Sequence, residues 1–212
     1  MSGTTNPSRY VLHNRRGSGG LVVEIALTLA DAPFDLVEYD TKPGSPMPAS
    51  FRAVNPWGQM PTLILPDGSM MTESAAILIH LAAKFPEKRL GPSPGTAAHA
   101  AFLRWLVFAN VNLYEAVLRR VYPGRYTTDP AAEPATQAAA IQRMGEALAL
   151  VERALVPGPF LLGADMSLAD IYVAMLSKWF RGSIDAPRLA ALRALVEAHP
   201  TVGPVWRRHF PA

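Results

Sequence analysis

Two serines in the sequence lie where a helix is predicted to begin, a position at which a side chain can bind a ligand or cap the helix. Ser18 precedes a predicted helix within a glycine-rich segment, and Ser74 follows Glu73 at the start of another. The first N–H groups of a helix lack partners within the helix and carry a partial positive charge, so both places suit an anion. Helix capping is the ordinary use of such residues and stays open for Glu73 and Ser74.

A third segment with chemical potential is the pair Met60 and Pro61, directly before a predicted strand. Proline donates no backbone hydrogen bond, and the bond preceding it is the only peptide bond that adopts the cis form at low cost. Pro61 can therefore turn a strand end outward. An ordinary trans loop proline is the alternative.

The first half of the chain predicts the element order β, α, β, loop, β, β, α over residues 9–85. Pro66, Asp67 and Gly68 suit a tight hairpin turn, so the two strands flanking them are expected to be antiparallel. A turn-rich segment, 42–48, follows the second strand. The expected strands are 9–13, 34–40, 62–65 and 69–72, and the expected helices are 21–30 and 75–85.

The second half predicts only helices. The segment 90–96 contains two Pro and two Gly without apolar periodicity, which is typical of a linker between domains. Ser167 and Asp170 form a capping-box pattern, with Met166 and Ile171 placed for the hydrophobic staple. The expected helices are 97–122, 135–155, 168–180, 188–198 and 202–209.

Composition excludes several classes of function. The 212 residues contain no cysteine, which rules out a catalytic protein thiol and a zinc–thiolate site. The formal charge of +3 is spread over scattered arginine pairs, so we expect no nucleic-acid binding. No uninterrupted apolar run approaches the roughly 20 residues that span a bilayer, so we expect no membrane partner. The start of the chain lacks the apolar segment of a secretory signal, which favours the cytoplasm.

The residues around Pro61 and Ser74 closely resemble the glutathione-binding half of glutathione transferases. The resemblance rests on the run NPWGQMPTL at 55–63 and TES at 72–74, and it extends into the second half through SLAD at 167–170 and the ending from His199 to Trp206. It implies a thioredoxin-like α/β domain with a mixed four-stranded sheet over 9–86, after a flexible tail, 1–8. A linker, 87–97, and an all-helical domain with a hydrophobic substrate site, 98–212, follow.

The resemblance also implies how glutathione, as co-substrate, is bound. Met60, before a cis Pro61, would pair its backbone with the cysteinyl unit, as in β-augmentation. Ser74 would hold the γ-glutamyl carboxylate, while Glu73 would accept from the ammonium group. For the glycyl end the candidates are Gln59, His13 and Lys42.

The catalytic requirement is a glutathione thiolate near neutral pH. An ordinary thiol has a pKa of about 8.5, so a useful shift is about two units, or roughly 2.7 kcal/mol. By resemblance Ser18 is the candidate catalytic hydroxyl. Aligned without gaps, however, Gly17 and Gly19 occupy the catalytic positions of related classes, which leaves backbone N–H groups, Asn14 or Arg16 as alternatives.

The function that the resemblance implies is conjugation of glutathione to a hydrophobic electrophile in detoxification, by a homodimer. Tyr114, one turn after Asn110, is the substrate-site candidate. A glutathione-dependent isomerase, dehalogenase or ether-cleaving enzyme of the same fold is an alternative. A further alternative is a non-catalytic binding or interaction module, because a fold can outlast its chemistry.

Overall fold

The structure is a computed structural model that describes residues 9–42 and 44–211, so the predicted flexible tail, 1–8, lies outside the described residues. The chain forms two compact units. The sheet unit consists of Met1–Leu90 with Glu197–Ala212, and the helical unit of Gly91–Val196. The sequence interpretation had assigned the last sixteen residues to the helical domain, whereas their contacts group them with the sheet unit.

The sheet unit contains the expected mixed four-stranded sheet, in the order β2-β1-β3-β4. Strands β1 and β2 are parallel, whereas β3 runs antiparallel to both β1 and β4. Leu12 in β1 pairs with Leu36 in β2 and Leu63 in β3, which places apolar side chains in the middle of the sheet. The strands are β1 Tyr10–Asn14, β2 Phe34–Glu38, β3 Thr62–Ile64 and β4 Met70–Met71. The last is shorter than the predicted strand 69–72.

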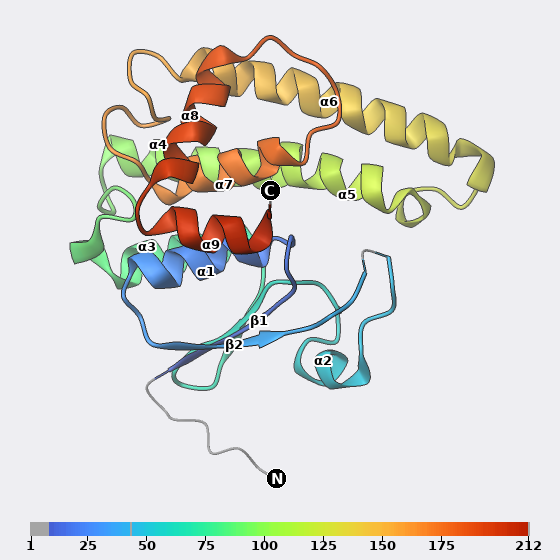
Figure 1. Cartoon of the computed structure of the whole chain (residues 1–212), viewed down its shortest axis with the longest axis horizontal. Helices are drawn as coiled ribbons and strands as arrows, with labels where there is room; N and C mark the ends of the chain where they lie inside the picture. The colour runs from blue at the N-terminus through green and yellow to red at the C-terminus, as the bar shows by residue number, and fades with distance from the viewer. Residues whose placement is uncertain (1–8, 43, 212) are drawn as a thin grey trace. The chain divides into compact units, whose positions relative to one another are not determined.

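Helix α1, Gly20–Leu29, lies at the centre of the sheet unit. It contacts β1, α3 (Ser74–Lys84) and α9 (Val202–His209), and every residue from Gly20 to Leu27 is buried. Figure 1 shows α1 and α9 together on one side of the strands. Helix α9 covers the face of α1 that carries Glu24, which explains how an acidic side chain comes to be only 5% exposed.

A short helix that the sequence analysis did not predict, α2 (Ala49–Val54), follows the turn-rich segment. Six residues are too few for a helical periodicity or for stability in isolation. Its single fully buried side chain, Phe51, contacts the rings of His13 and Tyr39, so packing on the sheet stabilises this helix.

The described residues of the helical unit contain no strand, as predicted. The predicted helix 97–122 is α4, Ala97–Phe108, and α5, Glu115–Val121, joined by a π-helical segment, Ala109–Tyr114. Helix α7 is the core of this unit, since all residues from Leu168 to Ser177 are buried. The other helices are α6 Glu133–Ala154 and α8 Pro187–Ala198, and 3-10 turns span Pro123–Arg125 and Pro130–Ala132, while a further one, Pro86–Lys88, follows α3 in the sheet unit.

The stretch Ala97–Val121 is long and apolar enough, by length and composition alone, to cross a membrane, which the sequence interpretation did not expect. Its faces are used within the helical unit, however, because α4 contacts α7 and α5 contacts α6. Phe102 and Trp105 on this stretch are buried, as expected of core residues.

Candidate functional site

The loop between α2 and β3 is organised by Asn55. This side chain is 2% exposed, and its amide nitrogen donates to the Gln59 carbonyl at 2.8 Å and to the Thr62 hydroxyl at 3.0 Å. Its Oδ1 accepts the Trp57 N–H at 3.0 Å. Asn55 thus fixes the loop from the inside with bonds at both ends, which determines where the backbone of the following residues lies.

The Met60–Pro61 peptide bond is cis, as the resemblance implied. Pro61 is buried, whereas Met60 is half-buried. Among the described residues, the Met60 N–H and C=O appear in none of the backbone hydrogen bonds outside regular helices and strands. These groups are the ones predicted to pair with an extended ligand, and their arrangement suits β-augmentation.

Glu73 and Ser74 form the start of α3. Glu73 has φ of 66° and ψ of 105°, a region that residues other than glycine rarely adopt. This conformation leaves Glu73 exposed while Ser74, the next residue, is only 2% exposed. Strained backbone of this kind persists where surrounding structure enforces it and is concentrated at functional sites.

The Ser74 hydroxyl is buried and, within the part of the chain that the structure describes, has no hydrogen-bond partner. A buried polar group without a partner costs about 1–3 kcal/mol, so a ligand oxygen that bonds it would recover this energy. The N-terminus of α3 adds free N–H groups and a partial positive charge at the same place. A carboxylate beside Ser74, with a cationic group beside the exposed Glu73 carboxylate, matches the charges of the γ-glutamyl unit of glutathione.

The first loop, between β1 and α1, contains Ser18. Its hydroxyl donates to Asn14 Oδ1 at 2.7 Å and accepts the Gly20 N–H at 3.3 Å, so here Ser18 bonds the backbone at the start of α1, whose N-cap is Gly19. The Asn14 amide lies directly against Gly20, where an added Cβ would overlap it, so a side chain at residue 20 would force Asn14 to move. Asn14 itself is fully buried, and its Nδ2 has no partner among the described residues.

Known proteins resemble this chain over both halves. Residues 21–84 match the family described as Glutathione S-transferase, N-terminal domain, and residues 134–209 match Glutathione S-transferase, C-terminal domain. An uncharacterised GST-like protein of Escherichia coli strain K12 is 30% identical over 169 residues, which are 78% of this chain and 80% of that protein. The chain belongs to the glutathione S-transferase family.

Solved structures of other glutathione S-transferases agree over nearly the whole chain. A glutathione transferase homologue from Sulfitobacter, solved with bound glutathione, is 26% identical with a TM-score of 0.85, covering 94% of this chain and 97% of its own. A sphingomonad glutathione S-transferase complexed with glutathione is 27% identical with a TM-score of 0.79, covering 95% and 100%. These neighbours support the two-part fold expected from the sequence.

Within this glutathione S-transferase family member, the three candidates for the glycyl end lie in different surroundings. His13 is buried, its Nδ1 lies 2.9 Å from the Tyr39 hydroxyl, and the two rings stack. Burial lowers the pKa of His13, so the ring is neutral at pH 7 and binds a carboxylate weakly. Gln59 is half-buried and Lys42 exposed, and both stay predictions.

Tyr114, the substrate-site candidate, lies in the π-helical segment of the helical unit. Its ring contacts those of Tyr172 and Trp179. Asn110, at the start of the same segment, accepts a hydrogen bond from the Tyr172 hydroxyl at 2.8 Å. Such segments are rare and often occur at functional sites. The role of Tyr114 toward a substrate stays a prediction.

Sequence reasoning missed the residues that hold the loop after β1 and the loop before β3 in this family member. Asn55 was seen only as part of a motif, and Glu24 and His209 as ordinary helix residues. Hydrogen bonds from one side chain to several backbone groups leave no periodic signal. A usable signal for Glu24 was an acidic residue within an otherwise apolar helix, which calls for a buried partner.

Proposed function

We propose that this protein is a glutathione transferase that binds glutathione as co-substrate and conjugates it to a hydrophobic electrophile. The single observation that carries the proposal is the buried, unpartnered Ser74 hydroxyl at the start of α3, one residue after the strained Glu73. The cis Met60–Pro61 bond and the glutathione bound in related structures add support.

Glutathione supplies the sulfur nucleophile, and the protein's residues bind and orient it. Ser74 and the α3 N-terminus hold the γ-glutamyl carboxylate, Glu73 accepts from its ammonium group, and Met60 pairs with the cysteinyl backbone. Gln59 lies in the same loop and serves the glycyl end. These contacts hold the peptide part of glutathione in a fixed position, which lowers the entropic cost of placing its sulfur for the reaction.

Ser18 is proposed to stabilise the thiolate, and the Asn14 amide decides whether its proton is free to do so. With Asn14 Oδ1 toward Ser18, the hydroxyl proton is donated to Asn14, as at 2.7 Å here. The NH2 and C=O ends of an amide have nearly the same shape, so the unpartnered Nδ2 can take this place instead. Ser18 would then accept from Asn14 and from Gly20, and its own proton would be free for the sulfur.

Turnover is the test of this proposal. Purified protein is mixed with glutathione and, in turn, an aryl halide and an α,β-unsaturated carbonyl, and conjugate formation is compared with the uncatalysed rate. We expect a rate clearly above background that falls about tenfold in Ser18→Ala, because a thiol pKa higher by about one unit leaves about one tenth of the thiolate. Glutathione binding without turnover would contradict catalysis and favour the binding module, a reading that the engaged Ser18 hydroxyl keeps open.

The homodimer is also a proposal. Val107 and Val111, one turn apart on the α4 stretch, are 52% and 59% exposed, and paired apolar side chains of this kind suit contact with a second copy. Light scattering after gel filtration tests it: Val111→Asp should shift a dimer toward monomer, and a wild-type monomer would contradict it. Cytoplasmic location and a role in detoxification stay predictions.

A further inference from the structure

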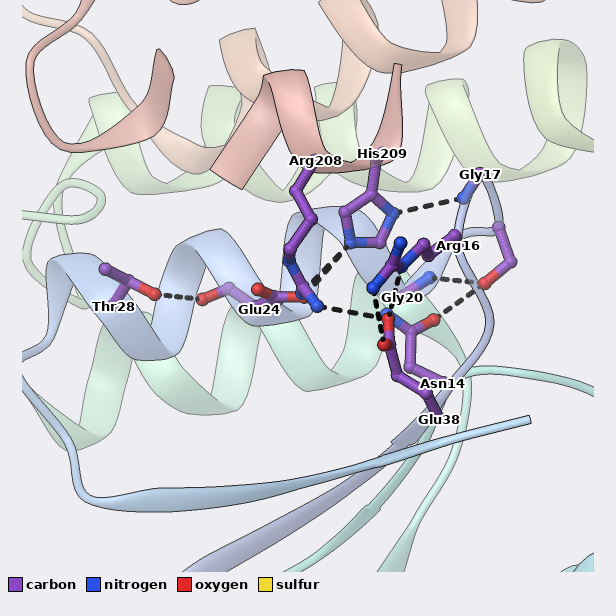
Figure 2. A network of polar contacts seen from close by, with 10 residues as sticks. Asn14, Arg16, Gly17, Gly20, Glu24, Thr28, Glu38, Arg208 and His209 are labelled. Carbon is purple, nitrogen blue, oxygen red and sulfur yellow. Dashed lines mark hydrogen bonds and ion pairs between the residues drawn. The ribbon is translucent and has the colours of Figure 1, made fainter. Parts of the chain in front are cut away.

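The last helix, α9, contacts the first loop of the sheet unit through the imidazole of His209. The Gly17 backbone nitrogen lies 3.2 Å from His209 Nδ1, and the Glu24 Oε2 of α1 lies 3.0 Å from Nε2. The side chain of His209 is fully buried. Figure 2 shows the ring between the loop and α1, with one nitrogen facing each. Residues almost two hundred positions apart in the chain are joined in this way.

The protonation state of His209 follows from its partners. A backbone N–H can only donate, so Nδ1 must carry a lone pair toward Gly17. The proton of the neutral ring is therefore on Nε2, where it is donated to the Glu24 carboxylate. The carboxylate orients the ring, and the ring in turn presents an acceptor to the loop.

The imidazole is one member of a closed ring of polar contacts. Arg208 pairs with the same Glu24 oxygen and donates to Glu38 Oε1 at 3.0 Å, and Arg16 lies 3.3 Å from the other Glu38 oxygen. Arg16 precedes Gly17, which closes the ring. The pairs differ in strength, because the Glu24 side chain is 7% exposed whereas that of Arg16 is 65% exposed. The exposed pair contributes little, so the buried imidazole is the main restraint on the loop.

Gly17 needs such a restraint. Its φ of 69° lies in the left-handed region that glycine adopts freely, and two more glycines follow within three residues. A loop of this composition has many accessible conformations, and the orientation of Ser18 depends on the conformation of Gly17. The bond to His209 selects one of them.

We propose that His209 is a positioning residue: by accepting the Gly17 N–H it fixes the first loop in the conformation that aims Ser18 and the N-terminus of α1 at the glutathione sulfur. The proposal rests on the proposed function for the role of that loop. In this proposal the fully buried His209 acts through Gly17 and not by direct contact with the ligand.

Two variants separate the two bonds of the imidazole. The amide of Asn takes roughly the place of Nδ1, and that of Gln roughly the place of Nε2. His209→Asn therefore keeps an acceptor for Gly17 and loses the bond to Glu24, whereas His209→Gln keeps a donor to Glu24 and loses the bond to Gly17. Arg207→Gln, at an exposed position on the same helix, is the matched control.

The first measurement needs no ligand. Hydrogen exchange of the Gly17 amide is followed by NMR in the free protein, with global stability measured in parallel. We expect exchange to become about three- to tenfold faster in His209→Gln, as for the loss of one hydrogen bond, and nearly unchanged in His209→Asn and Arg207→Gln. Equal Gly17 exchange in all variants would overturn the proposal.

The second measurement is the pKa of the glutathione thiol in the complex, read from thiolate absorbance against pH. We expect it to rise by about half a unit to one unit in His209→Gln, with kcat lowered and KM little changed, and to be restored in His209→Asn. A purely structural role predicts instead that both variants lose activity in proportion to stability, and that pattern would overturn the proposal. Failure of the wild-type protein to bind glutathione contradicts the proposed function instead, and Gly17 exchange then decides whether His209 holds the loop.

Discussion

The starts of helices α7 and α3 use the same kinds of side chain for different purposes. At α7 the Ser167 hydroxyl donates to the Asp170 carboxylate at 2.7 Å, and that carboxylate also accepts the N–H groups of Ser167 and Leu161 at 2.8 and 2.7 Å. At α3 the Ser74 hydroxyl is as deeply buried but has no partner within residues 9–42 and 44–211, and Glu73 is turned outward by its positive φ. The polar groups at the start of α7 are satisfied within the protein, and we call this the complete start. The start of α3, the incomplete start, is suited to an external partner.

The starts of α7 and α3 differ in where the acidic residue stands relative to the serine. A capping box needs the acid three residues after the serine, and Asp170 stands there relative to Ser167. Three residues after Ser74 stands Ile77, and the acid precedes the serine instead. Glu73 is the N-cap residue of α3, but its side chain makes no capping hydrogen bond, which leaves both side chains available to a ligand.

The largest effect is expected at the complete start. Asp170→Ala leaves the buried N–H groups of Leu161 and Ser167 without their acceptor, which costs roughly 3 kcal/mol or more of unfolding free energy. Urea unfolding and calorimetric melting measure this loss, with the exposed Asp185→Ala as control, expected within about 0.5 kcal/mol of wild type. Glutathione affinity of the folded variant should not change. An Asp170→Ala protein as stable as Asp185→Ala would break the comparison.

At the start of α3 we expect the reverse: a substitution should weaken glutathione binding and leave stability nearly unchanged. Ser74→Ala removes a buried hydroxyl for which the described residues offer no partner, so stability should stay the same or rise by up to about 1 kcal/mol. The dissociation constant for glutathione should rise at least tenfold, since a hydrogen bond to a charged group is worth about 1.5–3 kcal/mol. Titration calorimetry and urea unfolding report the two quantities. Loss of stability without loss of affinity would show that Ser74 is only a cap.

The start of α1 is an intermediate case, because Ser18 both accepts the Gly20 N–H and lies in the proposed catalytic loop. Ser18→Ala should cost about 1 kcal/mol of stability, as for the loss of a hydrogen bond, and raise the pKa of the bound glutathione thiol by about one unit. Glutathione affinity should stay within about twofold. A thiol pKa that does not move in Ser18→Ala would transfer the thiolate-stabilising role to the backbone N–H groups, Asn14 or Arg16.

How far the sequence predicts this molecule depends on the kind of signal. The element order of the first half, the helical second half and the capping box at Ser167 were predicted from periodicity and local spacing, whereas the mixed four-stranded sheet came from the resemblance. Helix α2 was missed because it is short and depends on the packing of Phe51. The cis bond at Pro61 came from the resemblance, since proline alone favours trans. The link from His209 to Gly17 is a contact across 192 positions, for which one sequence holds no local signal.

The smallest effect is expected at His13, whose ring already has a hydrogen-bond partner in the Tyr39 hydroxyl. Burial lowers its pKa, so the folded state favours the neutral ring, and the stability that depends on it is present above the unfolded value of about 6.5 and is lost as pH falls toward the lower folded value. Unfolding free energy should therefore drop between pH 7.5 and 5.5 more steeply in wild type than in His13→Gln. Glutathione affinity at pH 7.5 should be equal in both proteins. A large loss of affinity in His13→Gln would show that His13 contacts glutathione.

The central claim, that the start of α3 binds the γ-glutamyl carboxylate, is tested most directly by changing the ligand and the protein together. Calorimetry compares glutathione with an analogue that lacks this carboxylate, on wild type and on Ser74→Ala. We expect the analogue to bind wild type at least tenfold more weakly than glutathione, and Ser74→Ala to discriminate much less, so that the two changes are coupled by about 1 kcal/mol or more. If the losses of binding free energy from the missing carboxylate and from Ser74→Ala simply add, Ser74 does not bind this carboxylate and the claim is wrong.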